Sequence, residues 1–150
     1  MGFNIVLIEP EIPTNTGNIG RLSLASGSAL HLVKPFGFEL DDKLLKRAGL
    51  DYWKHISVNI YENVEDFFSK NKEANMVYFS SSATKNYTTI NFQDNMFFLF
   101  GKESVGLSKE ITVKKSDNLY KIPIYSKHVR SLNLANAVSI VVYEALRNLK

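Results

Sequence analysis

Three short polar segments carry the side chains of this chain that are best suited to binding or chemistry. They are Asn15–Arg21 (NTGNIGR), Phe100–Leu107 (FGKESVGL) and Ile122–Asn136 (IPIYSKHVRSLNLAN). Each segment follows or ends a short apolar run of the kind that forms a buried strand. Because ligands of α/β proteins bind at the carboxyl ends of strands, we expect the three segments to form one composite site.

The first segment combines glycines with polar side chains. Gly17 and Gly20 permit close approach to the backbone, and Asn18 carries both an amide donor and a carbonyl acceptor. Arg21 is expected one turn into a helix over 18–25, capped by Asn15 or Thr16, with its guanidinium at the mouth of the loop. A plain helix cap with a surface arginine is the alternative, and composition alone favours it.

The second segment has the glycines of a phosphate loop without the full pattern. The third glycine of a dinucleotide fingerprint is missing, no long helix follows directly, and no Gly-Lys-Ser/Thr closes a P-loop. We interpret the segment as a wall for a flat ligand, with Glu103 accepting hydrogen bonds. The alternative for Glu103 is a solvated loop acid.

The third segment pairs an extended backbone with the start of the longest expected helix. Ile122-Pro123-Ile124 offers backbone donors and acceptors beside apolar side chains, which suits an adenine ring. Ser131 and Asn133 are placed to cap the helix, and capping alone would explain both. Tyr143 brings a phenol to an otherwise apolar helix, so its hydroxyl needs a partner, either structural or functional.

Composition narrows the class of protein. The chain has 150 residues, which favours a single domain over 1–150, and 45% of them are apolar. The absence of cysteine excludes disulfides, thiolate metal sites and cysteine nucleophiles. No signal-peptide pattern opens the sequence, and no apolar run approaches the ~20 residues that span a bilayer. We therefore expect a cytoplasmic protein without a membrane partner.

The charged residues are compatible with a nucleic-acid partner but do not require one. The net charge is +3, and basic residues gather within 43–54 and 114–130. Ordinary solvated lysines are an equally weighted alternative. His31, His55 and His128 do not cluster with carboxylates, so no metal site is expected. His31 is interpreted as structural, whereas His128 adjoins the third segment and is a candidate ligand contact.

The hydrophobic pattern predicts an α/β fold with a mostly parallel sheet flanked by helices, because apolar runs alternate with amphipathic segments. The expected strands cover 3–8, 30–33, 56–61, 76–79, 96–100 and 119–122. The expected helices cover 18–25, 43–48, 64–70, 109–113 and 133–149, with Ser108 capping the fourth. Between 80 and 87 we expect a polar loop.

The last expected helix has little polar surface, so it must be buried nearly all round. On a chain of this size we favour a homodimer that covers one side, with Val141 or Val142 as candidates for the outward face. A position deep in a single core is the alternative. Asn136, Ile140, Tyr143 and Arg147 are expected to share one helical face.

The three segments together resemble the motifs of the SPOUT class of RNA methyltransferases, and within it the small tRNA 2′-O-methyltransferases that act on the wobble nucleotide. The opening IVLIEPEIP (5–13) and the stretch from Asp41 to Tyr52 resemble the same subfamily. The resemblance runs nearly end to end. It implies a C-terminal trefoil knot, a homodimer and S-adenosylmethionine as methyl donor.

The resemblance also implies a set of cofactor-binding residues: Ser80, Ser81, Gly101, Glu103, Ile122, Ser131, Leu132 and Asn133. By the same resemblance, Arg21 is the expected catalytic arginine and Tyr143 is the family's tyrosine on the last helix. Asn18, in the first segment with Arg21, is the third expected catalytic residue. Since arginine stays protonated, Arg21 is expected to hold a phosphate or stabilise a developing alkoxide.

For tRNA binding we expect a surface built from both basic stretches. Lys46 and Arg47 represent the first stretch, and His128 and Arg130 the second. In a dimer the two groups are expected to join into one surface. The leading hypothesis is S-adenosylmethionine-dependent 2′-O-methylation of the tRNA wobble ribose. The alternatives are the same reaction at another tRNA or rRNA site, and a catalytically silent RNA-binding module.

Overall fold

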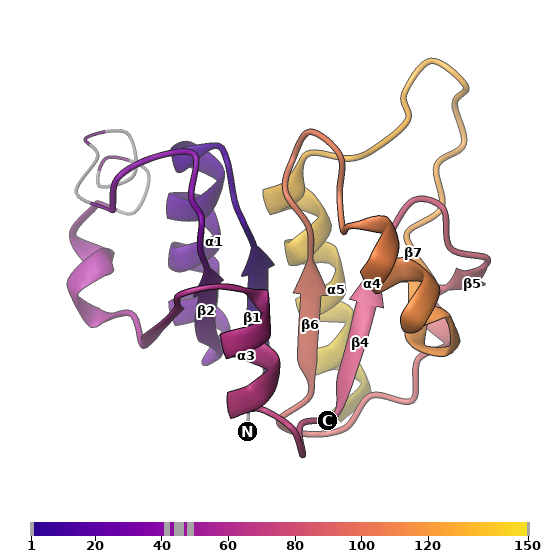
Figure 1. The fold of residues 1–150 in the computed structure, drawn as a ribbon, viewed down its shortest axis with the longest axis horizontal. Helices are drawn as coiled ribbons and strands as arrows, with labels where there is room; N and C mark the ends of the chain where they lie inside the picture. The colour runs from indigo at the N-terminus through magenta and orange to yellow at the C-terminus, as the bar shows by residue number, and fades with distance from the viewer. Residues whose placement is uncertain (1, 41–42, 44–46, 48–49, 150) are drawn as a thin grey trace.

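The computed structural model describes residues 2–40, 43, 47 and 50–149. Its strands are β1 (Asn4–Ile8), β2 (Ala29–Val33), β3 (Val58–Tyr61), β4 (Met76–Phe79), β5 (Lys85–Asn86), β6 (Phe97–Phe100) and β7 (Leu119–Lys121). They form one seven-stranded sheet in the order β3-β2-β1-β6-β4-β7-β5 (Figure 1). All of its neighbouring pairs are parallel. The expected parallel α/β fold is confirmed.

Helices cover both faces of this sheet. They are α1 (Pro13–Ser26), α3 (Val64–Lys70), α4 (Lys109–Lys114) and α5 (Leu134–Leu149), with short 3₁₀ helices η1 (Leu50–His55), η2 (Tyr87–Thr89) and η3 (Ser116–Asn118). In Figure 1, α1 and α5 lie behind the strands, and α3 and α4 lie in front. None of the helices in the described part is long and apolar enough to cross a membrane. The expected knot concerns the path of the whole chain and stays a prediction.

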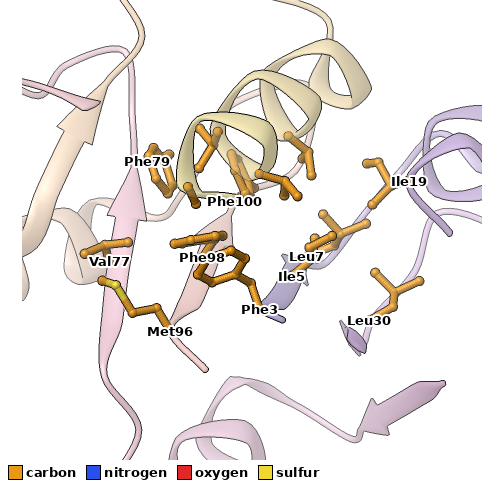
Figure 2. Packing of buried hydrophobic residues seen from close by; sticks show 14 of the residues in the cluster. Phe3, Ile5, Leu7, Ile19, Leu30, Val77, Phe79, Met96, Phe98 and Phe100 are labelled. Atoms are coloured by element: carbon orange, nitrogen blue, oxygen red, sulfur yellow. The ribbon is translucent and has the colours of Figure 1, made fainter. Parts of the chain in front are cut away.

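Two cores result from the alternation of side chains along the strands. In β1, Ile5 and Leu7 point to the face of α1 and α5, whereas Val6 and Ile8 point to the face of α3 and α4. Figure 2 shows the first core, where phenylalanines of β4 and β6 pack beside α5. Because β1 is buried on both faces, it is a continuous apolar run rather than an alternating one.

Most of the expected elements are found, some with shifted ends. The helix over 64–70 and the strand over 76–79 match α3 and β4, and Ser108 caps α4 by accepting from the Ile111 N–H. The loop after β4 contains the short strand β5, which sequence reasoning missed because two residues give no periodic signal. The helix expected over 43–48 falls mainly outside the described residues, although Lys43 and Arg47 are helical.

The start of α1 corrects the sequence-based expectation. The helix begins at Pro13 and not at Asn18, so Asn15 and Thr16 lie inside it and neither caps it. Proline is well suited to the first turn, where its missing N–H would have no helical partner. The N-cap residue is Ile12, whose side chain cannot accept a hydrogen bond. The cap is supplied instead by a group from a distant loop, described below.

The last helix is less buried than expected. Val138, Val141, Val142 and Ala145 are fully buried against the sheet, so neither Val141 nor Val142 faces outward. The opposite face carries Asn136, Ile140, Tyr143 and Arg147, all exposed, which confirms that these residues share one face. Ile140 is 37% and Tyr143 49% exposed, so they are the apolar groups left for a partner.

His31 on β2 is a buried histidine with both ring nitrogens in hydrogen bonds. Nε2 lies 2.9 Å from Asn4 Oδ1, and Nδ1 lies 2.9 Å from the Tyr61 hydroxyl. Since the Asn4 amide donates to the Asn95 carbonyl, its Oδ1 is left to accept, and His31 must carry its proton on Nε2. Burial lowers the pKa of His31 to about 4. The structural interpretation of His31 agrees with this geometry.

This histidine predicts a pH dependence of stability. The unfolded chain binds a proton on His31 near pH 6.5 and the folded chain only near pH 4. The contribution of His31 to the free energy of unfolding is therefore fully present above pH 6.5 and decreases as the pH falls toward 4. Urea unfolding at pH 7.5, 6 and 5 should show this decrease for the wild type. His31→Gln should have a flatter dependence, whatever its absolute stability. Equal slopes for both proteins would contradict the assignment.

Candidate functional site

A cavity of about 700 Å³ lies at the carboxyl ends of β4, β6 and β7 and against the start of α5. Its walls come from the segments 79–81, 100–106, 122–124 and 130–134, together with Ile12, Asn15 and Ala137. All the residues expected to bind the methyl donor line it: Ser80, Ser81, Gly101, Glu103, Ile122, Ser131, Leu132 and Asn133. The structure thus brings together the second and third sequence segments as one site. Their individual roles stay predictions.

The loop after β6 forms one wall and is folded tightly on itself. Lys102 and Gly106 form an isolated bridge, in which the Gly106 N–H donates to the Lys102 carbonyl at 2.8 Å. Gly106 has φ +72, a conformation that favours glycine. A Cβ on Gly101 would lie 2.1 Å from the carbonyl carbon of Gly106 and 2.1 Å from the nitrogen of Leu107. Glycine at 101 is therefore required for the loop to close.

Glu103 fixes this loop to the start of α1. Its Oε1 accepts from the Glu11 N–H at 2.8 Å, and its Oε2 accepts from the Ile12 N–H at 3.0 Å. A carboxylate here satisfies N–H groups at the helix start and interacts favourably with the helix dipole. The contact is reciprocal, because the Glu11 carboxylate accepts from the Ser104 N–H at 2.8 Å. That hydrogen bond lowers the pKa of Glu11.

Asn15 extends the connection to α5. Its amide nitrogen donates to Glu103 Oε2 at 3.2 Å, and its Oδ1 accepts from the Asn133 amide at 3.1 Å. Asn133 in turn caps α5, since its Oδ1 accepts from the Asn136 N–H at 3.2 Å. The expected capping role of Asn133 is confirmed. The bridging role of Asn15 was missed, because sequence reasoning used this buried residue as a helix cap.

The remaining walls combine aromatic or aliphatic surface with small polar groups. Phe79, Phe100, Ile122 and Ile124 supply the apolar part. Opposite them, the Ser80 hydroxyl lies 2.9 Å from that of Ser82 and accepts from the Ser82 N–H at 3.2 Å, which shapes the turn after β4. Such a lining suits a ligand with a flat ring and several polar substituents.

The expected catalytic residues are not part of the cavity wall. Arg21, Asn18 and Tyr143 are exposed on α1 and α5, and none of them lines the cavity. Because α1 begins at Pro13, Arg21 lies in the third turn of the helix and not one turn from its start. Its guanidinium carbon is 5.1 Å from the centre of the Tyr52 ring on η1. Tyr52 ends the stretch that resembles the subfamily, but sequence reasoning assigned it no role, because no local pattern marks its contact with Arg21.

The expected tRNA-binding residues are only partly near the site. Arg130 lines the cavity, and His128 is exposed two residues before it in the same segment. Arg47 is exposed and helical, whereas Lys46 lies outside the described residues. Across the described ranges, no group of His, Asp or Glu side chains is arranged to hold a metal ion.

The tight loop predicts a specific sensitivity at Gly101. Gly101→Ala must displace the loop, so its affinity for S-adenosylmethionine should fall about tenfold or more in calorimetry. Gly106→Ala is the matched control, because a Cβ there meets no atom within 4 Å and strains only the local backbone. The Gly101 variant should be affected more strongly. A reversed order would contradict the described packing of the loop.

Comparison with known proteins places this geometry in a family. A tRNA (cytidine(34)-2′-O)-methyltransferase of Saccharophagus degradans is 45% identical over 148 residues, covering 98% of this chain and 96% of that protein. The tRNA (cytidine(34)-2′-O)-methyltransferase of Methylovorus glucosotrophus is 42% identical over 146 residues, covering 97% of this chain and 94% of its own length.

Solved structures have the same fold. One that reports on 2-OH methylation of C/U34 on tRNA has a TM-score of 0.94 at 40% identity, covering 99% of this chain and 96% of that chain. An rRNA methyltransferase from Sinorhizobium meliloti, solved with bound AdoMet, has a TM-score of 0.88 at 27% identity. The match covers 99% of this chain and 57% of the Sinorhizobium chain. The SpoU rRNA Methylase family matches residues 2–143, and the chain belongs to that family.

Proposed function

We propose that this protein transfers a methyl group from S-adenosylmethionine to the ribose 2′-oxygen of the wobble nucleotide of tRNA, in the cytoplasm. The observation that carries the proposal is the cavity at the carboxyl ends of β4, β6 and β7, lined by the residues expected to bind the methyl donor. Relatives that match this chain over nearly its whole length are named for this reaction at cytidine 34.

The cavity fits S-adenosylmethionine in size and chemistry. A cavity of about 700 Å³ is within the range of small-molecule sites. Phe79, Ile122 and Ile124 offer apolar surface for an adenine ring, and Ser80 and Ser131 offer hydroxyl groups for the ribose and amino-acid parts. S-adenosylmethionine, when bound, supplies an electrophilic methyl group on a sulfonium. The carboxylate of Glu103 is already engaged by Glu11, Ile12 and Asn15, so its contribution is to hold the wall in place.

The protein itself must orient a poor nucleophile, the ribose 2′-hydroxyl. A ribose hydroxyl is protonated at neutral pH, so it must be oriented toward the methyl group and release its proton to solvent water as the new carbon–oxygen bond forms. Arg21 is suited to stabilise the developing negative charge on that oxygen or to hold the adjacent phosphate. Asn18 lies one helical turn before Arg21 and is exposed like it, so both amide and guanidinium face the same solvent region.

A homodimer is part of the proposal. The cavity of one chain is not lined by Arg21, Asn18 or Tyr143, so a single subunit does not place them at the expected methyl donor. Ile140 and Tyr143 form an exposed apolar pair on α5, which packs beside α1. Packing of this face against a second copy would cover Ile140 and Tyr143. Side chains of each subunit would then lie closer to the cavity of the other.

Binding of tRNA is assigned to exposed basic groups near the cavity mouth. Arg130 lines the cavity, and Lys127 and His128 precede it in the same exposed segment. Phosphate contacts of this kind strengthen binding without reading sequence. Discrimination of the wobble nucleotide then depends on the unstacked bases of the anticodon loop.

The experiment that tests the proposal is methyl transfer with mapping of the product. Purified protein is incubated with labelled S-adenosylmethionine and either total tRNA or, in a separate reaction, rRNA, and the modified nucleotide is located by digestion and mass spectrometry. We expect a 2′-O-methyl group at position 34. A methyl group at another tRNA position or on rRNA would assign the same chemistry to a different substrate. Transfer to neither RNA would contradict the proposal.

Arg21 yields the first prediction on catalysis. Arg21→Ala should retain the fold and the affinity for S-adenosylmethionine, because Arg21 is exposed and does not line the cavity. Its single-turnover rate should fall about 100-fold or more, since one preorganised charge contact is lost. The measurement is rapid quench with saturating tRNA. A rate near that of the wild type would remove Arg21 from the mechanism.

The dimer yields a second prediction. Ile140→Glu places a charge on the exposed apolar face of α5, so it should convert the dimer into monomers or lower its stability in analytical ultracentrifugation. Glu110→Lys is a control that changes an exposed residue on α4, on the opposite face of the sheet. A wild-type protein that is monomeric at micromolar concentration would refute the dimer.

A further inference from the structure

Arg21 has an aromatic neighbour that the proposed mechanism does not use. The Arg21 guanidinium carbon lies 5.1 Å from the centre of the Tyr52 ring, within the ~6 Å range of a cation–π interaction. Tyr52 belongs to η1, which is remote from α1 in the sequence. Its side chain is 39% exposed, so the pair lies at the surface, where a substrate has access.

The position of Tyr52 follows from the packing of η1 on α1. A Cβ on Gly20 would lie 2.9 Å from Trp53 Cζ3 and 2.9 Å from Ile56 Cδ1, so glycine lets both side chains lie directly on the helix. Trp53 and Ile56 also pack against the main core. They anchor η1 beside the residue that precedes Arg21, and the adjacent Tyr52 ring is held next to the guanidinium.

An aromatic ring can orient an arginine and leave both its charge and its N–H donors available. A carboxylate partner would occupy guanidinium N–H groups and neutralise the charge. A ring that stacks on the guanidinium leaves its N–H groups, which point outward in the plane, free to donate to phosphate or to an anionic oxygen. It also restricts a long side chain that would otherwise sample many rotamers.

We propose that Tyr52 is a positioning residue for Arg21: its ring face, held by the packing of Trp53 on Gly20, keeps the guanidinium oriented for the reacting ribose or its phosphate. The inference rests on the proposed methyl transfer and on the role of Arg21 in it. Tyr52 itself does not line the cavity, and it acts on the reacting atoms only through Arg21.

The test compares Tyr52→Leu, which removes the ring, with Tyr52→Phe, which keeps it. Tyr52→Leu should lower kcat about two- to fivefold, the effect of losing an exposed cation–π contact. Tyr52→Phe should retain the wild-type kcat. The KM for S-adenosylmethionine and the unfolding midpoint should change little in either variant, because Tyr52 does not line the cavity and is partly exposed.

A double-mutant cycle separates positioning from a general structural effect. In an Arg21→Ala background, Tyr52→Leu should cause no further loss in the single-turnover rate. The proposal is overturned if Tyr52→Leu has the wild-type kcat or if Tyr52→Phe and Tyr52→Leu lower kcat equally. It is also overturned if Tyr52→Leu still lowers the single-turnover rate in the Arg21→Ala background.

A measurement independent of activity keeps this inference distinct from the proposed function. Nitrogen-15 relaxation of the Arg21 Nε–H reports directly on the mobility of the side chain. It should show a more ordered Arg21 in the wild type and in Tyr52→Phe than in Tyr52→Leu. If the wild type methylates no RNA, the proposed function fails, and this comparison still decides the positioning role. Equal mobility in all three proteins would refute it.

Discussion

The carboxylate of Glu103 is the group on which the rest of the site depends. It accepts hydrogen bonds from the backbone of Glu11 and Ile12 and from the amide of Asn15, so the loop after β6 is fixed to the start of α1. Because Asn15 also accepts from Asn133, the start of α5 belongs to the same network. Segments from three distant parts of the chain thereby keep one geometry, which is what a preorganised binding site requires.

The parallel sheet explains why these segments meet. All of its strands run in the same direction, so the chain leaves β4, β6 and β7 at one edge, and the polar segments that follow them gather there. The two apolar cores leave this edge open while they bury both faces of β1. Arg21 and Tyr143 lie on the exposed sides of α1 and α5, and the proposed homodimer rests on that exposure.

The sequence predicted the elements better than their connections. Apolar runs located β4 and α3, and the glycine-containing segments located the lining of the cavity. The start of α1 was wrong, because its cap is Glu103, a residue that is remote in sequence and therefore invisible to a local capping pattern. The contacts of Asn15 and Tyr52 were missed for the same reason, since each depends on how separate elements pack. Family membership was inferred from the motifs and confirmed by the match over residues 2–143.

A crystal structure with S-adenosylhomocysteine, the demethylated product, tests the proposed methyl-donor site most directly. We expect the ligand in the cavity between the segments 79–81, 100–106 and 122–124, with its adenine against Ile122 and Ile124. Glu103 should keep its hydrogen bonds to Glu11, Ile12 and Asn15. A ligand bound elsewhere, or a Glu103 carboxylate that leaves α1 to bind the ligand, would contradict the proposed site and the role of Glu103 in it.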